Sequence, residues 1–465
     1  MKKITYTAAA LLLFATSIFA QLGTEGVFDA RNYGMGRTAN AISKGVFAVG
    51  INPANIISYP ANKLEISTLL PFPSLNMKGG TSFITIDDIN YYFGGVNGQA
   101  RYLSASDKQK LMDIFSGGGT FGANISVNLF MISFMPDPSI GAFAFTVNDV
   151  ASVKLNIPQA IADLALNGNP AGKQFDFSDF DLKSWYLRSF ALSFAKRIFS
   201  TEEFPSDIIT AGVTVKYVQG FYYAGTDAVN SRFTTGTSGQ IEGSSDFRGF
   251  SAFSSNFGVK YDFDPVKREQ NITPFPEPAG TGLGLDLGVN ATLGNEWKLS
   301  LALTDLGKIK WDKNAAQFSA TGTITIDDIS NQAQRDSLKD KFVGKSKKID
   351  SFETSLPTAL RLGVAKYFTS SLLVAADYNI GFNDMPGNST KSRFSVGVEW
   401  KPMDWIPYIR SGVTFGGLYG FGWSAGLGFD INILEINLAT SDFNSFVSPN
   451  KAKYLSFAID TRWKF

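Results

Sequence analysis

The chain has 465 residues with a formal net charge of +1, and it contains neither cysteine nor histidine. A net charge near zero gives no electrostatic reason to expect nucleic acid or another highly charged partner. Without cysteine and histidine there are no disulfides, no thiol or Ser-His catalysis, and none of the usual zinc or copper ligands. Carboxylate pairs such as Asp176 and Asp179 leave glycosidase-type chemistry open, but their phenylalanine-rich surroundings favour a loop. We therefore expect no enzyme, no cofactor and no metal site.

The first twenty residues have the pattern of a secretory signal peptide. Lys2 and Lys3 precede a short apolar stretch, and Ala20 is a small residue suited to cleavage before Gln21. No later stretch has the roughly 20 consecutive apolar residues that a membrane-spanning helix needs. We expect an exported protein from which residues 1–20 are removed.

Residues 21–61 show no alternation of polar and apolar side chains. They contain two short motifs, Gly34-Met35-Gly36 and Asn52-Pro53-Ala54. Glycine lets the backbone pass close to other groups and Asn-Pro starts turns, so the motifs alone predict a loop. We therefore expect residues 21–61 to form a segment distinct from the strands of residues 62–465.

From residue 62 the chain alternates in segments typical of β-strands. We predict strands at 62–75, 121–134, 139–150, 185–198, 208–224, 281–293, 297–306, 358–367, 372–381, 392–400, 406–415, 420–429, 432–440 and 453–465. Alternation places apolar residues on one face and polar residues on the other, as in a barrel that faces lipid outside and encloses a polar lumen. The sequence therefore predicts an all-β protein, a transmembrane antiparallel β-barrel of about 14 strands.

Short and long connections alternate along the chain, which is typical of barrels with short periplasmic turns and long extracellular loops. Both chain ends are then expected in the periplasm. Within the long connections we predict an extra hairpin in 229–262 and helices at 107–115, capped by Ser104 or Ser106, and at 159–166. The repeated Ile-Thr-Ile-Asp-Asp-Ile motif predicts Asp88 and Asp328 as helix caps, with calcium binding as the alternative.

The last strand has an apolar face that ends on Trp463 and Phe465. This ending resembles the C-terminal signal of outer-membrane barrels, which implies the barrel-assembly machinery as a partner. The alternative is an ordinary sandwich strand that happens to be last. Tryptophans near strand ends are expected in girdles that contact outer-membrane lipid at the two interfaces. These tryptophans are Trp297, Trp311, Trp400, Trp405 and Trp463.

Charged residues on the inward faces are expected to line the lumen. They are Asp286, Arg361, Asp377 and Glu399, and we expect them to pair with one another or with the N-terminal segment rather than bind substrate. Gly282, Gly284 and Gly288 lie on one strand that alternates with leucine. Small inward residues leave room there for a plug or a ligand.

The N-terminal motifs resemble those of FadL-type transporters of hydrophobic compounds and of PorV-type barrels. In those families a glycine-bearing stretch leads to an Asn-Pro-Ala motif, as Gly34, Met35, Gly36, Asn52, Pro53 and Ala54 do here, although Asn55 stands where glycine is expected. Residues 358–429 resemble the same barrels. Residues 301–311 resemble an uncharacterised barrel family of Bacteroidota. The resemblance implies that residues 21–61 form a plug inside a barrel of residues 62–465.

The resemblance leaves the function open. One implied function is passive transport of a small hydrophobic compound across the outer membrane, with the plug shifting to let it pass. The alternative is a PorV-like partner in protein secretion or surface attachment that holds a secreted protein on loops 225–280 or 307–357. An apolar lumen pocket beside the plug would favour transport, and a filled lumen would favour the partner role. A purely structural role is the third alternative.

Overall fold

The computed structural model describes residues 24, 29–57, 63–96, 99, 101–200, 206–263, 270–271, 273–294, 296–326 and 345–465. The expected signal peptide, residues 1–20, and the expected cap Asp328 lie outside the described residues.

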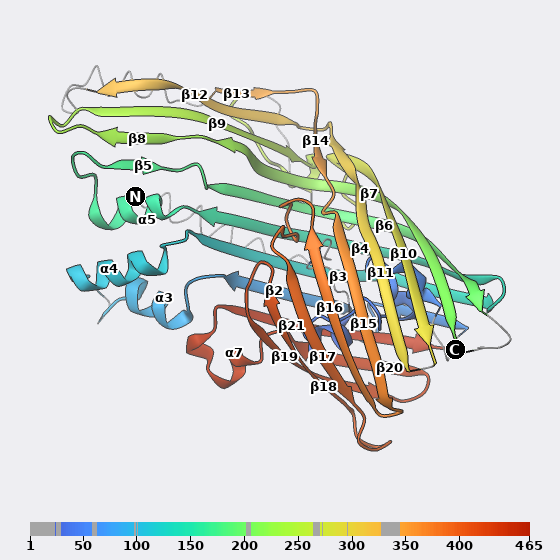
Figure 1. Ribbon diagram of the computed structural model, residues 1–465. Helices are drawn as coiled ribbons and strands as arrows, with labels where there is room; N and C mark the ends of the chain where they lie inside the picture. The colour runs from blue at the N-terminus through green and yellow to red at the C-terminus, as the bar shows by residue number, and fades with distance from the viewer. Residues whose placement is uncertain are drawn as a thin grey trace.

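One antiparallel sheet closes on itself to form a barrel of 14 strands, as predicted (Figure 1). The first wall strand consists of two pieces, β1 (Leu64–Thr68) and β2 (Ser74–Thr81). The others are β3 (Gly119–Asp137), β4 (Gly141–Ile157), β6 (Asp181–Ser200), β7 (Ile208–Val229), β10 (Gly280–Leu293), β11 (Trp297–Trp311), β15 (Ala359–Thr369), β16 (Leu372–Gly381), β17 (Arg393–Trp400), β18 (Tyr408–Gly416), β19 (Gly422–Asp430), β20 (Leu434–Thr440) and β21 (Tyr454–Lys464). The barrel closes where β21 pairs with β1 and β2.

The remaining described elements are not among the 14 wall strands. The additional strands are β5 (Gln174–Asp176), β8 (Arg232–Thr235), β9 (Ile241–Phe253), β12 (Ala316–Ile326), β13 (Lys345–Lys348) and β14 (Phe352–Ser355). The helices are α2 (Ala30–Gly34), η3 (Gly45–Ala48), η4 (Pro53–Ile56), α3 (Ile86–Phe93), α4 (Ala105–Ile114), α5 (Gln159–Asn167), η5 (Ser255–Phe257), α7 (Asn444–Val447) and η6 (Pro449–Lys451). None of these described helices is long and apolar enough to cross a membrane.

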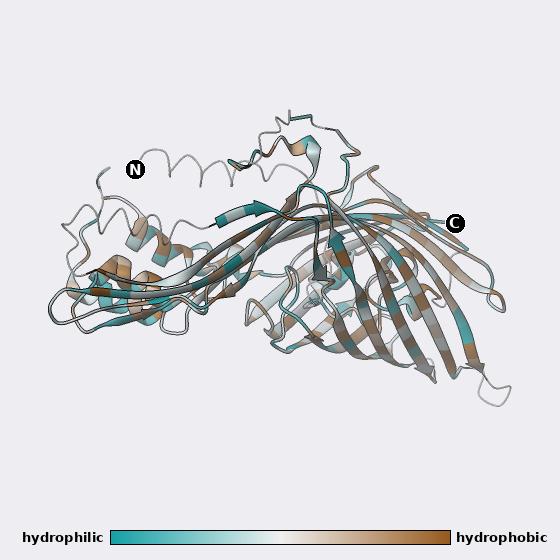
Figure 2. Ribbon diagram, turned by 90° about the horizontal axis from the view of Figure 1, so that it is seen from above, coloured by the Kyte–Doolittle hydropathy of each residue, from teal (hydrophilic) through white to brown (hydrophobic). Residues whose placement is uncertain are grey.

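The wall strands separate their side chains between the two faces of the barrel. In β16, for example, Asp377 and Asn379 are buried inside, whereas Tyr378 between them is exposed outside. Hydrophobic positions recur along the barrel strands in Figure 2. Alternation along a strand thus gives an apolar outer surface and a polar interior, which suits a wall between lipid and a lumen.

Part of the wall continues as an open sheet beyond the end with the long loops, which we call the long-loop end. The strand β7 has 22 residues, whereas about 10 suffice to cross a membrane. It pairs with β10 as far as Gly220 and then with β9, which in turn pairs with β12. The predicted hairpin in 229–262 is confirmed as β8 and β9. The sheet leaves the barrel to one side, near α3, α4 and α5 (Figures 1 and 2).

The helices α3 and α4 in the long connections begin at side-chain caps. Ser104 and Asp107 form a capping box at the start of α4, so of the two predicted caps Ser104 is correct. The predicted helix at 159–166 is α5. At α3 the prediction was wrong in detail, because Thr85 is the cap and Asp88 completes the box by accepting hydrogen bonds from Thr85.

The first wall strand was predicted to end at residue 75, but it continues to Thr81 after an outward bulge at residues 69–73. The bulge is closed at its base, where the hydroxyl oxygens of Ser67 and Ser74 lie 2.9 Å apart. Thr461 on β21 donates a hydrogen bond to the Phe72 carbonyl at 2.6 Å and accepts one from Ser67 through its own carbonyl. Two of the bulge residues are prolines, which have no N–H, so fewer backbone donors need partners in an apolar surrounding.

Replacing Thr461 with valine removes the hydroxyl donor while keeping the side-chain shape. We expect Thr461→Val to lower the free energy of unfolding by about 1 kcal/mol, because the Phe72 carbonyl loses its partner. Urea-induced unfolding in lipid vesicles, followed by tryptophan fluorescence, measures this change. Thr281→Val, at a partly buried position of β10, is the control. An unchanged midpoint for Thr461→Val would show that this hydrogen bond does not stabilise the bulge.

Candidate functional site

Residues 29–57 lie inside the barrel, and we call them the luminal segment (Figure 1). All of them are buried except Lys44, which is partly exposed. The segment contains only the short helices α2, η3 and η4 and no strand. Its first helix begins where the Asp29 carboxylate accepts a hydrogen bond from the backbone N–H of Asn32 at 2.8 Å. The N–H of Ala30 is bound by Asp460 of the wall.

Glycines of the wall make room for this segment. On six different strands a glycine faces inward at a point where the luminal segment occupies the place of a side chain. These residues are Gly212, Gly288, Gly363, Gly397, Gly412 and Gly426. A Cβ atom at Gly412 would lie 2.3 Å from the carbonyl carbon of Met35, and one at Gly212 would lie 2.4 Å from that of Pro53. Any larger residue at either position would collide with luminal backbone.

The three glycines singled out on β10 differ in what they face. A Cβ at Gly288 would lie 2.0 Å from the side-chain oxygen of Asn52, so this position does leave room for the luminal segment. Gly284 instead approaches Leu356, and Gly282 approaches the backbone of Lys308 on β11. The expected space for a plug is therefore present at one of the three glycines.

All six residues of the two N-terminal motifs lie in the lumen and are buried: Gly34, Met35, Gly36, Asn52, Pro53 and Ala54. Gly34 packs against Gly426, and Met35 against Gly397 and Gly412. Gly36 has a φ of +70° and a Cβ there would be 2.9 Å from the carbonyl oxygen of Val413, so the turn requires glycine.

The second motif binds the opposite part of the wall. The Asn52 side chain donates to the carbonyl of Val289 at 3.1 Å and accepts from the N–H of Ala54 at 3.0 Å, which caps η4. Asn55, the departure from the family pattern, donates to the carbonyl of Asn40 at 2.8 Å and to the Ser43 hydroxyl at 3.0 Å. It therefore ties two turns of the luminal segment together.

Two of the predicted luminal charges hold the segment directly. Glu399 on β17 forms a bidentate ion pair with Arg31, with both N···O distances 2.8 Å, and also binds Arg410 at 2.7 Å. Asp377 on β16 accepts hydrogen bonds from the backbone N–H groups of Ala39 at 2.7 Å and Asn40 at 2.9 Å. Because these carboxylates are buried, each needs such partners to offset the loss of water.

The other two predicted charges lie in a layer between the luminal segment and the long-loop end. Asp286 and Asp305 both bind Lys216, at 2.8 and 2.5 Å. Arg361 donates to Thr304 at 3.3 Å and to Asn379 at 3.4 Å. We call this the ion-pair layer. All four predicted luminal charges thus face the lumen and are bound by protein groups.

An aromatic layer lies beyond the ion-pair layer, toward the long-loop end. Its buried members are Val150, Trp185, Leu187, Val218, Tyr223, Ala252, Ala279, Ile309, Trp311, Leu356 and Met385, with Phe250 and Phe352 packed against them. The order follows β7, on which Gly212 faces Pro53, Lys216 forms the ion pairs and Gly220 packs against Trp311. Trp311 donates its indole N–H to the Thr354 hydroxyl at 2.9 Å.

Trp311 was predicted to belong to an interfacial girdle, and this was wrong. Asp305 has a positive φ of 59°, and the pairing of β10 with β11 shifts register between Leu285 and Leu287. The extra residue reverses the alternation, so Trp311 turns into the lumen although Trp297 on the same strand points outward. Trp400 and Trp405 are also exposed, Trp463 near the C-terminal end of β21 is partly buried, and the last residue, Phe465, is exposed.

Sequence reasoning missed Arg31, Lys216, Asp305 and Arg410. Lys216 and Arg410 occupy inward positions of predicted strands, so the alternation could have identified them. Arg31 and Asp305 carry no such signal, because one lies in a segment without strands and the other in a bulge.

A loop between β16 and β17, residues 382–392, bridges parts of the lumen. Met385 packs in the aromatic layer, and Asn388 accepts a hydrogen bond from the N–H of Thr24 at 3.0 Å. Asp384 binds Lys154 of β4 at 2.8 Å. Burial acts to raise the pKa of Asp384, but the bonds from Lys154 and Thr390 outweigh it and lower the pKa below its ordinary value. The Asp384 carboxyl is therefore ionised at neutral pH.

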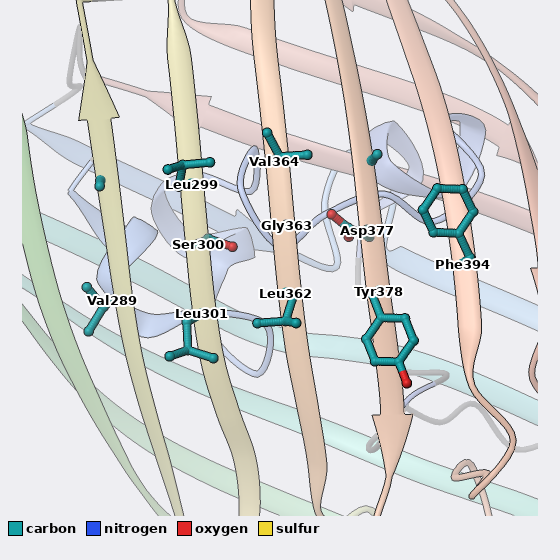
Figure 3. A pocket seen from close by; sticks show the side chains of 12 residues that line it. Val289, Leu299, Ser300, Leu301, Leu362, Gly363, Val364, Asp377, Tyr378 and Phe394 are labelled. Carbon is teal, nitrogen blue, oxygen red and sulfur yellow. The ribbon is translucent and has the colours of Figure 1, made fainter.

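Two cavities among the described residues bear on the hypotheses. The smaller, about 10 Å³, lies between the luminal segment and the wall, beside Asp29, Arg31, Glu435 and Arg462. It is polar and holds about one water molecule. The larger, about 540 Å³, opens on the outer face of the wall and not into the lumen (Figure 3). Neither is the apolar lumen pocket that the transport hypothesis anticipated.

A family model matches residues 60–441, which is most of the chain. The chain belongs to DUF5723, a family of unknown function. The expectation of an uncharacterised family is confirmed to this extent, and the FadL and PorV resemblance stays a prediction. No curated protein matches the DUF5723 chain significantly.

Solved barrels resemble the DUF5723 chain in structure. The toluene transporter TodX of Pseudomonas putida is 12% identical, covers 97% of this chain and 100% of its own, and has a TM-score of 0.44. A TodX deltaS2S3 mutant, a monoaromatic hydrocarbon channel, is 11% identical, with coverages of 94% and 99% and a TM-score of 0.48. The CymD monoaromatic hydrocarbon channel is 12% identical, with coverages of 96% and 99% and a TM-score of 0.46. At these identities and scores the likeness carries no argument about function.

Adding a methyl group at Gly412 of the DUF5723 barrel should displace the luminal segment. Its Cβ would meet the backbone of Met35, so we expect Gly412→Ala to destabilise the docked segment by about 1–3 kcal/mol. Trypsin should then cut the folded barrel faster at Arg37 and Lys44. Gly79→Ala is the control, because its Cβ would meet Ala123 at an ordinary 3.6 Å. Equal cleavage of both variants would show that the segment adapts freely.

Removing the Arg31 side of its ion pair should loosen the segment and spare the wall. Arg31→Gln leaves Glu399 paired with Arg410. We expect it to lower the free energy that holds the luminal segment against the wall by about 1.5–3 kcal/mol. Hydrogen exchange of residues 29–57 should accelerate while β16 and β17 stay protected. Arg248→Gln is the control, because its ion pair with Asp227 is half-exposed and surface pairs contribute little. Unchanged exchange in Arg31→Gln would exclude the pair as an anchor.

Proposed function

We propose that the protein is an outer-membrane barrel that passes a small hydrophobic compound, with the luminal segment as its gate. The observation that supports this most is the aromatic layer inside the lumen. The interior of a water-filled porin is polar, whereas Trp185, Tyr223 and Trp311 are packed in one buried apolar cluster. An apolar compound that enters from the long-loop end and displaces these side chains would find an apolar environment there.

The order of the layers along the lumen is the reason for assigning the gate to the luminal segment. A compound that reached the aromatic layer would next meet the ion-pair layer and the luminal segment, so passage requires that segment to move. Its contacts with the wall glycines are packing contacts, and its main polar anchors are Arg31 to Glu399 and the N–H groups of Ala39 and Asn40 to Asp377. The sequence has no nucleotide-binding motif, so movement is driven by binding of the compound and its gradient.

The proposal includes the route by which the protein reaches the membrane. Residues 1–20 act as a cleaved signal peptide, and the barrel-assembly machinery recognises the strand that ends on Trp463 and Phe465. The short-turn end then faces the periplasm and the long-loop end faces outward.

A reversible lock on the luminal segment tests the gate. A Cβ atom at Gly34 would lie 3.3 Å from the Cβ of Ala439 and 2.9 Å from the Cα of Gly426. A small shift away from Gly426 would bring the two Cβ atoms to the separation of about 3.5–4.5 Å that a disulfide spans. Because the chain has no cysteine, Gly34→Cys with Ala439→Cys forms a single defined bond. We expect uptake of a labelled monoaromatic hydrocarbon or fatty acid by Gram-negative cells to stop when the pair is oxidised and to return on reduction.

Each single-cysteine variant controls for the effect of the substitution itself. Uptake that is equal in the oxidised and reduced states would show that the luminal segment is not the gate. If the wild-type barrel adds nothing to the uptake of control cells for any apolar probe, the transport proposal is wrong.

A second function, holding a secreted protein at the cell surface, is favoured by the sheet beyond the barrel. The strands β9 and β12 and the helices α3 to α5 add a large structure that transport does not need (Figure 1). The small size of the cavity beside the luminal segment fits this role as well. For such a protein the disulfide lock would have no effect, and removing the β8–β9 hairpin would abolish function while the barrel remains folded.

A further inference from the structure

The larger cavity lies on the lipid-facing side of β10, β11, β15, β16 and β17. Strand pairing aligns outward side chains into rows across these strands. One row consists of Val289, Leu301, Leu362, Tyr378 and Phe394. The next row toward the short-turn end consists of Ala291, Leu299, Val364, Ala376 and Val396. The second row has the smaller side chains, so the surface is hollowed along it.

The hollow has a volume of about 540 Å³, which is in the range of small-molecule sites. Its walls are Leu299, Leu301, Leu362, Val364 and the ring of Tyr378 (Figure 3). Its floor is wall backbone at Ser300, Gly363 and Asp377, whose side-chain directions point into the lumen. A side chain at Gly363 would point into the lumen, where Asn40 of the luminal segment already occupies the space. We call this hollow the outer groove.

A lysine lies one step beyond the groove, toward the short-turn end. Lys366 follows Val364 on the same face of β15 and is paired with Trp297 on β11. Its ammonium nitrogen lies 4.8 Å from the ring centre of Trp297 and 5.0 Å from that of Phe368. Two aromatic rings hold the cation at the edge of the apolar surface, where the interface of a membrane lies. The outward face therefore places a fixed positive charge next to an apolar groove.

We propose that the outer groove binds one phospholipid of the leaflet at the short-turn end. An acyl chain lies over β15 between the side chains of β11 and β16, and Lys366 binds the phosphate. A phospholipid combines an apolar chain with an anionic group at one end, which is the order of groove and lysine along β15. The proposal requires that the barrel spans a membrane, and it is independent of transport.

Native mass spectrometry of the purified barrel, titrated with defined lipids, tests the proposal. Phosphatidylglycerol and a diacylglycerol with the same chains separate the role of the phosphate from that of the acyl chains. We expect the wild type to retain one phosphatidylglycerol at least tenfold more tightly than the diacylglycerol. Lys366→Gln should weaken phosphatidylglycerol about tenfold and leave the diacylglycerol unchanged.

Two further variants make the test specific. Lys401→Gln is the matched control, because Lys401 also lies over an aromatic ring, 5.0 Å from the centre of Tyr408, but away from the groove. Ala376→Phe fills the groove from the lipid-facing side, so we expect it to weaken both lipids. Heat-modifiable migration on gels checks that all variants form folded barrels.

Four results would overturn the proposal. If Lys366→Gln and Lys401→Gln weakened phosphatidylglycerol retention equally, the lipid would be attracted by positive charge in general and not by the lysine beside the groove. Unchanged lipid retention by Ala376→Phe would mean an empty groove. Equal retention of the two lipids by the wild type would exclude phosphate recognition. Tighter retention of lipid A than of phosphatidylglycerol would assign the groove to a different lipid. A Lys366-specific and Ala376-sensitive phosphatidylglycerol site would support it.

Discussion

The structure depends on one steric constraint, the absence of side chains where the wall meets the luminal segment. Gly212, Gly397, Gly412 and Gly426 let backbone of the segment approach backbone of the wall more closely than any other residue allows, and Gly288 makes room for the Asn52 side chain. A barrel of this size would otherwise enclose empty space or water. The close approach also brings luminal N–H groups within reach of wall carboxylates, so packing and hydrogen bonding reinforce each other.

The polar interior follows from the same arrangement. The luminal segment has short helices and turns, and its backbone groups find few partners within the segment itself. Asp377 and Asp460 bind such groups, and Glu399 neutralises Arg31. Buried charges are costly alone but are compensated when paired. The wall therefore holds the segment through specific bonds, and any movement of the segment must exchange these bonds for others or for water.

The inner and outer faces of the wall are coupled at β15. The Gly363 position is filled from the lumen by Asn40, and its bare backbone forms the floor of the outer groove. The Asn40 side chain also donates to the carbonyl of Leu362 at 2.8 Å, and Leu362 lines the groove. A single strand thus separates the luminal segment from the outer surface of the barrel, and the same residues contribute to both surfaces.

The sequence by itself determined the barrel, its strand number and most inward charges. Alternation is a local property of a strand, and the two faces of a membrane barrel demand opposite polarity, so Asp286, Arg361, Asp377 and Glu399 could be placed without a structure. Local start and stop signals likewise identified α4, which Ser104 caps, and α5, which begins after Pro158 and ends before Gly168. Resemblance to known barrels suggested the N-terminal segment as a plug.

Only the tertiary structure decided which groups meet. The bulge at Asp305 reverses the alternation and brings Trp311 into the lumen, and no local pattern announces it. The ion pair between Arg31 and Glu399 joins residues far apart in the chain. The steric role of the wall glycines is visible only when the luminal segment lies against them. The rows that form the outer groove exist only across five paired strands. Contacts of this kind depend on register and closure, which are properties of the whole sheet.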